Sequence, residues 1–420
     1  MRKLFILIVA SVLSVQGASK MKVSNMVTPI ELSEETYLLA ALDAQIRHKY
    51  TVASNYFETL YSKTGKKEFL YQSLRMLEQS NEIDQLSEAT KKELTKTPDD
   101  LTLKRFNIIS LLKSGQFGHA SQEASALCEQ SKVASDYALS AEACLKLDEF
   151  QNAYSALQKG YDLSHDEEMA DRLALIQYVH LGEKKEAIEF LKNHIEKYGN
   201  SKVLGKRLGS FYGDRGELDK AAAMFDQTYT LTSDPLIAQE AIKIYVYQQN
   251  FDKLTPLLEK SGINDPMLLE LYIRDKQFDK ASLLAKKLYK QDQNPLYLAQ
   301  SSIFSYEASN NKSDLILLKE VVEGLKQVNS EIDDPMYLNY LGYLMIDHDL
   351  NVTEGMAYVE RALKKQPDSA YYLDSLAWGY YKKGECAQAL KLIKQVESMI
   401  GSGEQEVKEH LDAIEKCEVK

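Results

Sequence analysis

Proline is scarce in this chain, glycine is moderate and cysteine is rare: the 420 residues include 8 Pro, 19 Gly and 4 Cys. So few prolines and glycines exclude long disordered linkers. Alternating apolar and polar runs bounded by Asn-Gly or Asp-Gly turns are also missing, which argues against an all-β fold. Ala, Leu, Lys, Glu and Gln, which favour helix, dominate instead. The composition therefore predicts an all-α protein.

The chain also lacks a basic excess and any motif of catalytic chemistry. Its formal charge of −11 disfavours a nucleic-acid partner, and we expect the densest basic run, Lys286–Lys290, on a solvated helix face. No GxxxxGK[ST], HExxH, GxSxG or GxGxxG motif occurs, and the seven His residues are scattered. We therefore expect no enzyme, no catalytic residue, no metal site and no cofactor.

Only the N-terminus carries a long apolar run. Arg2 and Lys3 precede apolar residues from Leu4 to about Val15, and Val15 and Gly17 are suitable residues for a signal-peptidase site. This pattern predicts a signal peptide over residues 1–17. The run is short for a membrane span, which needs about 20 residues; an uncleaved anchor is the alternative. The composition is typical of bacteria, so we expect a periplasmic protein with no transmembrane segment in the mature chain, peripheral to a membrane at most.

A unit of 33 or 34 residues repeats along the chain. Its marker is a small or apolar residue that opens a second helical stretch, at Ala53, Leu86, Ala120, Ala153, Ala187, Ala221 and Leu254. About twelve residues before each marker lies a residue that would face it, and a short hinge such as Lys113–Phe117, His180–Lys184 or Asp214–Leu218 lies between them. Each unit is therefore predicted to be a helix, a tight turn and a second helix.

This period and layout resemble the tetratricopeptide repeat. The match is best at Leu208, Gly209, Tyr212, Gly216, Ala221 and Phe225, at Leu376, Ala377, Tyr380, Gly384 and Ala389, and at Leu341, Gly342, Ala362 and Pro367. The resemblance implies an α-solenoid, a superhelix of stacked helical hairpins. We expect about eleven repeats and a C-terminal capping helix.

The regular period breaks between Leu254 and Gly355. The break suggests five segments: the signal peptide (1–17), an N-terminal extension (18–32), an N-terminal array (33–261), a C-terminal array (262–403) and the capping helix (404–420). Two explanations of the break are open, local drift of the repeat or a hinge between the two arrays.

The four cysteines are placed in two pairs by this layout. Cys128 and Cys144 fall on helices that should touch, and Cys386 and Cys417 fall on the last repeat and the capping helix. An even number of cysteines in an exported protein favours disulfides. We hypothesise Cys128–Cys144 and Cys386–Cys417 bridges, with buried free thiols as the alternative for each pair.

In the resembling family, the first helices line a concave groove, with about the second, fifth, ninth and twelfth places of each repeat facing it. In the last two repeats these places carry Met336, Asn339, Tyr343, Ile346, Tyr371, Asp374, Trp378 and Tyr381. Aromatic side chains dominate protein-binding hot spots. We expect Asn339, Tyr343, Tyr371, Asp374, Trp378 and Tyr381 to contact a partner; packing against the capping helix is the alternative for this cluster.

These features predict a scaffold or assembly factor of the bacterial cell envelope, which would bind a peptide or helix of a partner protein in its groove. The rival function is binding of peptidoglycan or another carbohydrate, because an aromatic row of Tyr343, Tyr371, Trp378 and Tyr381 could stack on sugar rings. The sequence names neither the partner nor the process.

Overall fold

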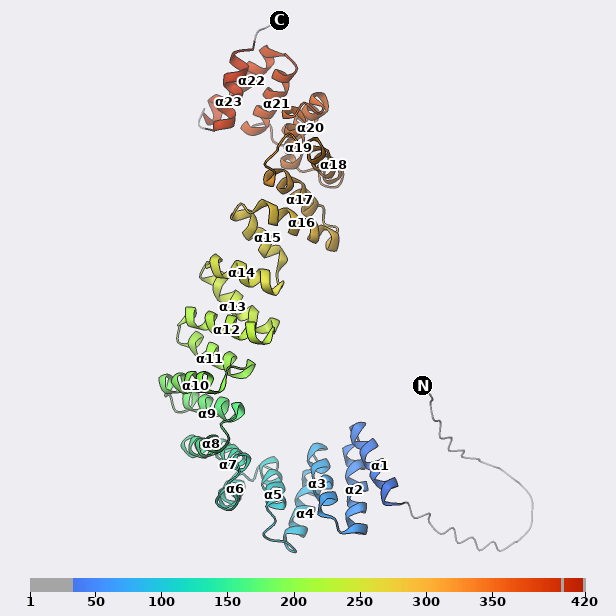
Figure 1. The fold of residues 1–420 in the computed structure, drawn as a ribbon, viewed down its shortest axis with the longest axis vertical. Coiled ribbons are helices and arrows are strands. Elements are labelled where there is room, and N and C mark those ends of the chain that lie inside the picture. Colours follow the sequence, from blue (N-terminus) through green and yellow to red (C-terminus); the bar gives the residue numbers. More distant parts are fainter. Residues whose placement is uncertain (1–32, 402–403, 418–420) are drawn as a thin grey trace, which may run out of the picture. The chain divides into compact units, whose positions relative to one another are not determined.

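The computed structural model describes residues 33–401 and 404–417. The predicted signal peptide and N-terminal extension lie outside the described residues. The described part contains 23 α-helices and no strand (Figure 1). The all-α prediction is therefore confirmed.

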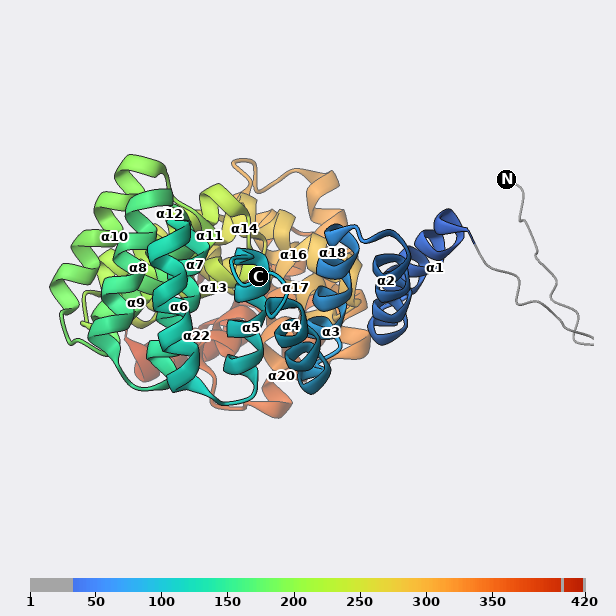
Figure 2. The ribbon, with the colours of Figure 1, turned by 90° about the horizontal axis from the view of Figure 1, so that it is seen from below.

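The helices form eleven consecutive hairpins followed by one further helix (Figures 1 and 2). Odd-numbered helices from α1 to α21 are the first helices of the hairpins and even-numbered ones the second. The hairpins are α1 (Glu34–Ile46) and α2 (Tyr50–Thr64), α3 (Lys67–Gln79) and α4 (Ile83–Leu94), α5 (Leu101–Lys113) and α6 (Phe117–Ser131), α7 (Ala134–Lys146) and α8 (Phe150–Ser164), α9 (Glu167–Val179) and α10 (Lys184–Tyr198), α11 (Lys202–Asp214) and α12 (Leu218–Thr232), α13 (Pro235–Tyr247) and α14 (Phe251–Ser261), α15 (Asp265–Arg274) and α16 (Phe278–Asp292), α17 (Pro295–Ala308) and α18 (Leu315–Glu331), α19 (Pro335–Asp347) and α20 (Val352–Lys365), and α21 (Ala370–Lys382) and α22 (Cys386–Ile400). The last helix is α23 (Gln405–Glu415).

Nearly every turn within a hairpin carries one residue in the left-handed backbone region. Gly115, Gly182, Gly216 and Gly384 supply it at four turns, with φ between 73° and 77°. Six other turns place a side chain there, at His48, Asn81, Asp148, Gln249, Lys276 and Asp349. These positions recur mostly at steps of 33 or 34 residues, so the predicted hinges at Lys113–Phe117, His180–Lys184 and Asp214–Leu218 lie where the helices end.

The marker residues lie at the contact between the two helices of a hairpin. Ala41 and Ala53 are fully buried in the first hairpin, Ala141 and Ala153 in the fourth, and Ala377 and Ala389 in the last. In α11, a methyl group on Gly209 would lie 2.6 Å from the Phe225 ring, too close for any side chain. Small residues therefore let the paired helices approach, and larger ones fill the spaces that remain.

The described chain divides into two compact units, the first ending at Ile176 and the second beginning at Gln177. The division falls inside α9. The array boundary expected at residue 261 lies within the second unit. The repeats around it are altered: α14 has 11 residues and α15 has 10, against 13 or 15 in most other helices. The turn between α17 and α18 is longer, and no described residue of it has a positive φ.

Candidate functional site

The predicted groove residues come from two neighbouring first helices. Asn339 and Tyr343 lie on α19, and Asp374, Trp378 and Tyr381 lie on α21. These helices are packed directly against each other in the second unit. The structure therefore brings the predicted residues together, although much of the cluster is covered.

The last helix, α23, covers it. The His410 ring of α23 stacks on Trp378 with centroids 4.2 Å apart, and its Nδ1 lies 2.9 Å from Asp374 Oδ2. Both members of the His410–Asp374 pair are buried, with 4% and 6% of their surfaces exposed. The indole N–H of Trp378 donates to Asp347 Oδ1 at 3.0 Å. Trp378 is thus fixed by internal contacts.

Tyr343 makes the second contact with α23. Its hydroxyl donates a hydrogen bond to Glu406. Burial, with help from this carboxylate, raises the pKa of Tyr343 well above its usual value. We call the set of Tyr343, Asp374 and Trp378 the aromatic surface. The capping helix is the partner of this surface in this structure.

The remaining predicted residues differ in their exposure. Tyr381 is half-buried and stacks on Trp378 with centroids 4.7 Å apart. Asn339 is half-buried, and its Oδ1 atom is buried without a hydrogen bond. Only Tyr371 of the four proposed sugar-stacking aromatics is exposed. These four residues therefore do not form an exposed aromatic row on which a carbohydrate could stack.

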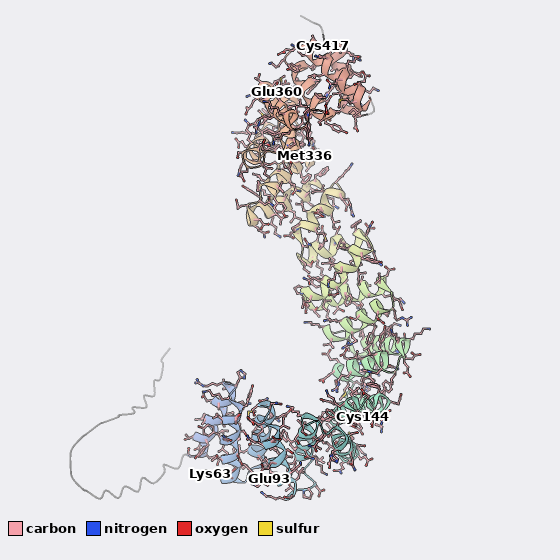
Figure 3. The ribbon with its side chains drawn as sticks, turned by 180° about the vertical axis from the view of Figure 1, so that it is seen from behind. Lys63, Glu93, Cys144, Met336, Glu360 and Cys417 are labelled. Carbon is pink, nitrogen blue, oxygen red and sulfur yellow. A yellow bond between two sulfur atoms is a disulfide. The ribbon has the colours of Figure 1, made fainter. Side chains whose placement is uncertain are left out.

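A different row of side chains is exposed on the second unit. The second residue of five first helices is apolar and at least 43% exposed: Val203, Leu236, Leu296, Met336 and Tyr371. We call this set the apolar row; Met336 is labelled in Figure 3. Of these residues, the sequence predicted only Tyr371 as a partner contact. Met336 occupies a predicted groove place of the same two repeats, and the other three lie in repeats for which no groove residue was predicted.

Three members of the row lie next to an N-cap that fixes where their helix begins. Three first helices begin with proline, and the residue before each proline is Asp234, Asn294 or Asp334. The side chain of that residue accepts a hydrogen bond from the backbone N–H of the residue after the proline, which is Leu236, Leu296 or Met336. Proline is suited to the first helical position, where its missing N–H costs nothing. The pattern Asp or Asn, Pro, apolar residue is therefore the sequence signal that could have found the row.

An ion pair shows that successive first helices begin side by side. Lys202 at the start of α11 lies 2.5 Å from the carboxylate of Asp234, the N-cap residue of α13. Lys202 precedes Val203 and Asp234 lies two residues before Leu236. The two apolar side chains therefore extend from adjacent helix starts.

A hollow of about 280 Å³ lies beside Val203. Its lining consists of Lys202, Val203, Lys206, Arg207 and Ser210, all from α11. The hollow thus combines one apolar side chain with cationic ones, of which Lys202 already pairs with Asp234. An apolar side chain next to a carboxylate suits such a place.

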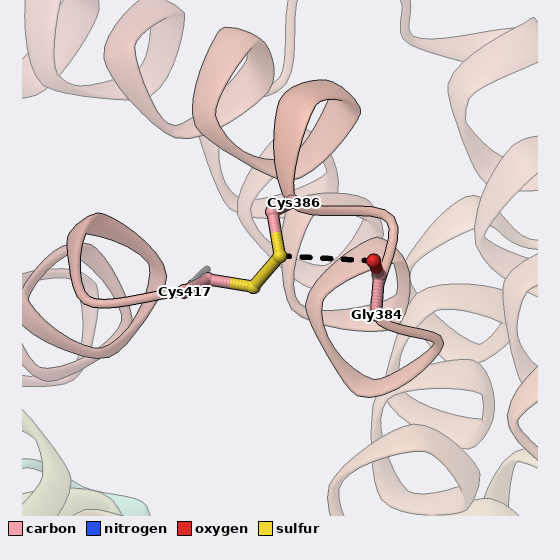
Figure 4. Close-up of a disulfide and its surroundings, with 3 residues drawn as sticks. All are labelled: Gly384, Cys386 and Cys417. Atoms are coloured by element: carbon pink, nitrogen blue, oxygen red, sulfur yellow. Dashed lines mark hydrogen bonds between the residues drawn. A yellow bond between two sulfur atoms is a disulfide. The ribbon is translucent and has the colours of Figure 1, made fainter. Parts of the chain in front are cut away.

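The cysteines behave differently in the two units. In the second, Cys386 and Cys417 form a disulfide with Cα atoms 5.7 Å apart (Figure 4). In the first, Cys128 and Cys144 are buried free thiols, which corrects the hypothesis of a bridge between them. The antiparallel packing of α6 and α7 explains this: Cys144 faces Ser121, at a sulfur–oxygen distance of 3.7 Å, two turns from Cys128. Two turns are about 11 Å along a helix, beyond the reach of a disulfide.

Among residues 33–401 and 404–417, no group of three or more His, Cys, Asp or Glu side chains could hold a metal ion. No helix of this part is long and apolar enough to span a membrane. The expectations of no cofactor and no catalytic residue stay predictions.

Comparison with known sequences gives one local match. No family model matches the chain. A TPR repeat-containing protein of Pseudomonas aeruginosa is 28% identical over 109 residues, which are 26% of this chain and 17% of that protein. The aligned region thus covers about a sixth of the relative.

Similar solved structures come from several organisms. MamA of Desulfovibrio magneticus is 20% identical, with 39% of this chain and 93% of that one covered at a TM-score of 0.34. Yeast Tom70 is 16% identical, with 91% and 95% covered at a TM-score of 0.30. At such scores these likenesses carry no argument about function.

The helical repeat and the local sequence match both resemble the tetratricopeptide repeat. Eleven helical hairpins with buried small residues at their contacts, mostly at a 33- to 34-residue spacing, have the layout of the tetratricopeptide repeat. The Pseudomonas aeruginosa relative carries the same repeat by name. The chain therefore has the helical-repeat layout of tetratricopeptide-repeat proteins and a local sequence similarity to one of them.

Proposed function

We propose that this protein is a non-enzymatic, exported scaffold that binds a segment of a partner protein along the apolar row of its second unit. The observation that carries the proposal is the repetition of one exposed apolar residue at the same place of five first helices. Single exposed apolar residues are ordinary, but a set that recurs at the same place of five of the six first helices from α11 to α21 is typical of a binding face.

The chemistry beside the row defines the kind of partner. A segment with apolar side chains in series would bury them against the row, and the hollow at Val203 would take a carboxylate next to Lys206. The charge of −11 disfavours nucleic acid as the alternative polyanion. We therefore propose an apolar peptide or amphipathic helix with at least one acidic residue.

Export has two independent supports. The basic and apolar pattern of residues 1–17 is that of a signal peptide, and the Cys386–Cys417 disulfide suits an oxidising compartment. With a bacterial composition, these support the periplasm and a role in assembling an envelope complex. Osmotic-shock fractionation tests the location: we expect the shock fluid to contain a chain that lacks residues 1–17, and a full-length cytoplasmic chain would refute export.

The binding face is tested by capture with matched variants. The test variant carries Leu236→Glu and Leu296→Glu on the row, and the control carries Leu231→Glu and Leu283→Glu on exposed sites of α12 and α16. Each purified protein is used as bait for envelope extract, and captured proteins are quantified by mass spectrometry. We expect one partner to be retained by the wild type and the control and reduced at least tenfold by the test variant.

Equal reductions in both variants would assign the effect to general surface charge. An unchanged partner in the test variant would refute the apolar row as the binding face. Circular dichroism of all three proteins confirms that the substitutions leave the helices intact.

A further inference from the structure

The last helix, α23, makes contacts through two of its faces. Val407, Leu411 and Ile414 enter the hydrophobic core of the last hairpin with Ala389 and Ile393. The second face carries the buried His410 and, one helical turn away, the exposed Glu406, and it contacts Tyr343, Asp374 and Trp378. A cap that only shielded the core would need the first face alone.

The second face makes specific side-chain contacts. Glu406 accepts from Tyr343, and His410 pairs with the buried Asp374 while stacking on Trp378. A buried polar pair such as His410–Asp374 adds little to stability compared with apolar packing, but it specifies one partner and one register. The aromatic surface is therefore complementary to one helix with a carboxylate and an imidazole four residues apart.

A covalent bond holds this helix in place. Cys386 opens α22, and Cys417 follows the last turn of α23 (Figure 4). Lys394 of α22 adds an ion pair with Glu415 at 2.5 Å. At the other end, α22 stops at Gly401, whose φ of 71° ends the helix. The disulfide thus links the far end of α23 to the start of α22.

We propose that the aromatic surface is a helix-binding site whose resident ligand is the chain's own α23, and that α23 of a second copy takes its place when the Cys386–Cys417 disulfide is open. The second copy is the occupant because its helix carries the Glu406 and His410 contacts already seen within one chain. The inference stands apart from the proposed function, since its test needs no partner protein.

Opening the disulfide requires a dithiol reductant. The reductant gives two electrons and two protons, so that Cys386 and Cys417 become thiols and the reductant becomes a cyclic disulfide. The helix stays attached through its N-terminal end, so the chain's own α23 competes at a millimolar effective concentration. Exchange between copies is therefore expected to increase with protein concentration.

The test begins with the wild-type chain. Equal amounts of ¹⁵N-labelled and unlabelled protein are reduced with dithiothreitol, concentrated, and reoxidised with oxidised glutathione. We expect a dimer on non-reducing gels whose yield rises with protein concentration, and mass spectrometry should find Cys386 of one copy joined to Cys417 of the other. Monomers alone at every concentration, or dimers joined through Cys128 or Cys144, would overturn the proposal.

A peptide experiment tests whether the Glu406 and His410 face is what is recognised. The probe is a peptide of residues 404–417, and the target is the full chain with His410→Ala and Cys417→Ser, which weaken and untether its own helix. With oxidised glutathione as the two-electron oxidant, we expect the peptide to form a disulfide with Cys386 at least tenfold more efficiently than the same peptide with His410→Ala. Equal trapping of both peptides would show that the His410 contact is not recognised and that α23 only covers the core, which would overturn the proposal.

Discussion

Gly209 and Gly213 stand one turn apart on α11 in different surroundings. A methyl group on Gly209 would lie 2.6 Å from a carbon of the Phe225 ring, whereas one on Gly213 would meet no atom within 4 Å. Both glycines have ordinary helical backbone, so an alanine changes packing at one site and helix propensity at both.

The pair gives the first prediction. Gly209→Ala should destabilise the chain by about 1–3 kcal/mol, because overpacking moves Phe225 or separates α11 from α12. Gly213→Ala should stabilise it by about 0.8–1 kcal/mol through helix propensity. Thermal unfolding followed by circular dichroism measures both. A stabilising Gly209→Ala would contradict the close approach of the two helices.

The two free thiols give the second prediction. Burial raises the pKa of Cys128 to about 11 and also raises that of Cys144. Because the thiolate is the reactive form, both should resist alkylation at pH 7.5 in the folded chain. Intact mass should show no iodoacetamide adduct on the folded protein, two after denaturation and four after denaturation with reduction. Four adducts without reduction would contradict the Cys386–Cys417 disulfide.

At this scale the sequence predicts the buried contacts well. Ala221, Ala377 and Ala389 lie where the repeat pattern places them, because small residues at hairpin contacts are a local requirement. It predicts the exposure of Trp378 less well. Whether Trp378 faces solvent depends on where α23 packs, and nothing in the local pattern of α21 fixes that.

Only some of the hairpin turns can be recognised from the residues that form them. Turns with glycine, such as those at Gly115 and Gly216, stand out because glycine suits the left-handed region. Turns at Gln249 and Lys276 adopt the same conformation with residues that carry no such signal. The period of the repeat therefore predicts these turns better than residue identity does.

The irregular segment has visible causes. Gly262, with φ of 62°, ends α14 early, and Pro266 lies in the first turn of α15. Both residues lie in the stretch between Leu254 and Gly355, where the period of the sequence breaks. Whether this stretch acts as a hinge stays a prediction, since packing within single hairpins does not decide it.

Neighbouring hairpins are joined at their ends by acidic residues, and Asp214 is one of them. It accepts from Lys184 at 2.7 Å and from the Tyr178 hydroxyl at 2.6 Å, and Tyr178 stacks on Phe211. Lys184, followed by Tyr178, holds the pKa of Asp214 below its usual value. The charged form therefore stabilises the folded chain above the ordinary Asp range, and this contribution is lost as the pH falls through the lowered pKa.

The third prediction follows from that sign. Asp214→Asn should lower the melting temperature at pH 7, and the difference from the wild type should shrink as the pH falls below about 4. The control is Asp412→Asn at an exposed position of α23, where we expect little change at either pH. A difference for Asp214→Asn that persists at pH 2.5 would contradict the ionic origin of the contact.

For the molecule as a whole, the repeat explains both the core and the proposed binding face. Stacked hairpins bury their small and large apolar residues between helices, which leaves the second places of the first helices at the surface. In the second unit, five of those places carry apolar side chains that are exposed and belong to no hydrophobic core of the described chain. The sequence predicts the stacking from its period, but it does not show which places stay exposed.

The central claim is that a partner protein lies along the apolar row in the cell. Site-specific photocross-linking tests it most directly, with a photoreactive phenylalanine analogue placed at Leu236, Leu296 or Met336 and, as controls, at Leu231 or Leu283. We predict that light produces a cross-link to the same protein from all three row positions and from neither control. Cross-links from the controls but not from the row, or none from any row position in a chain that is exported and folded, would contradict the claim.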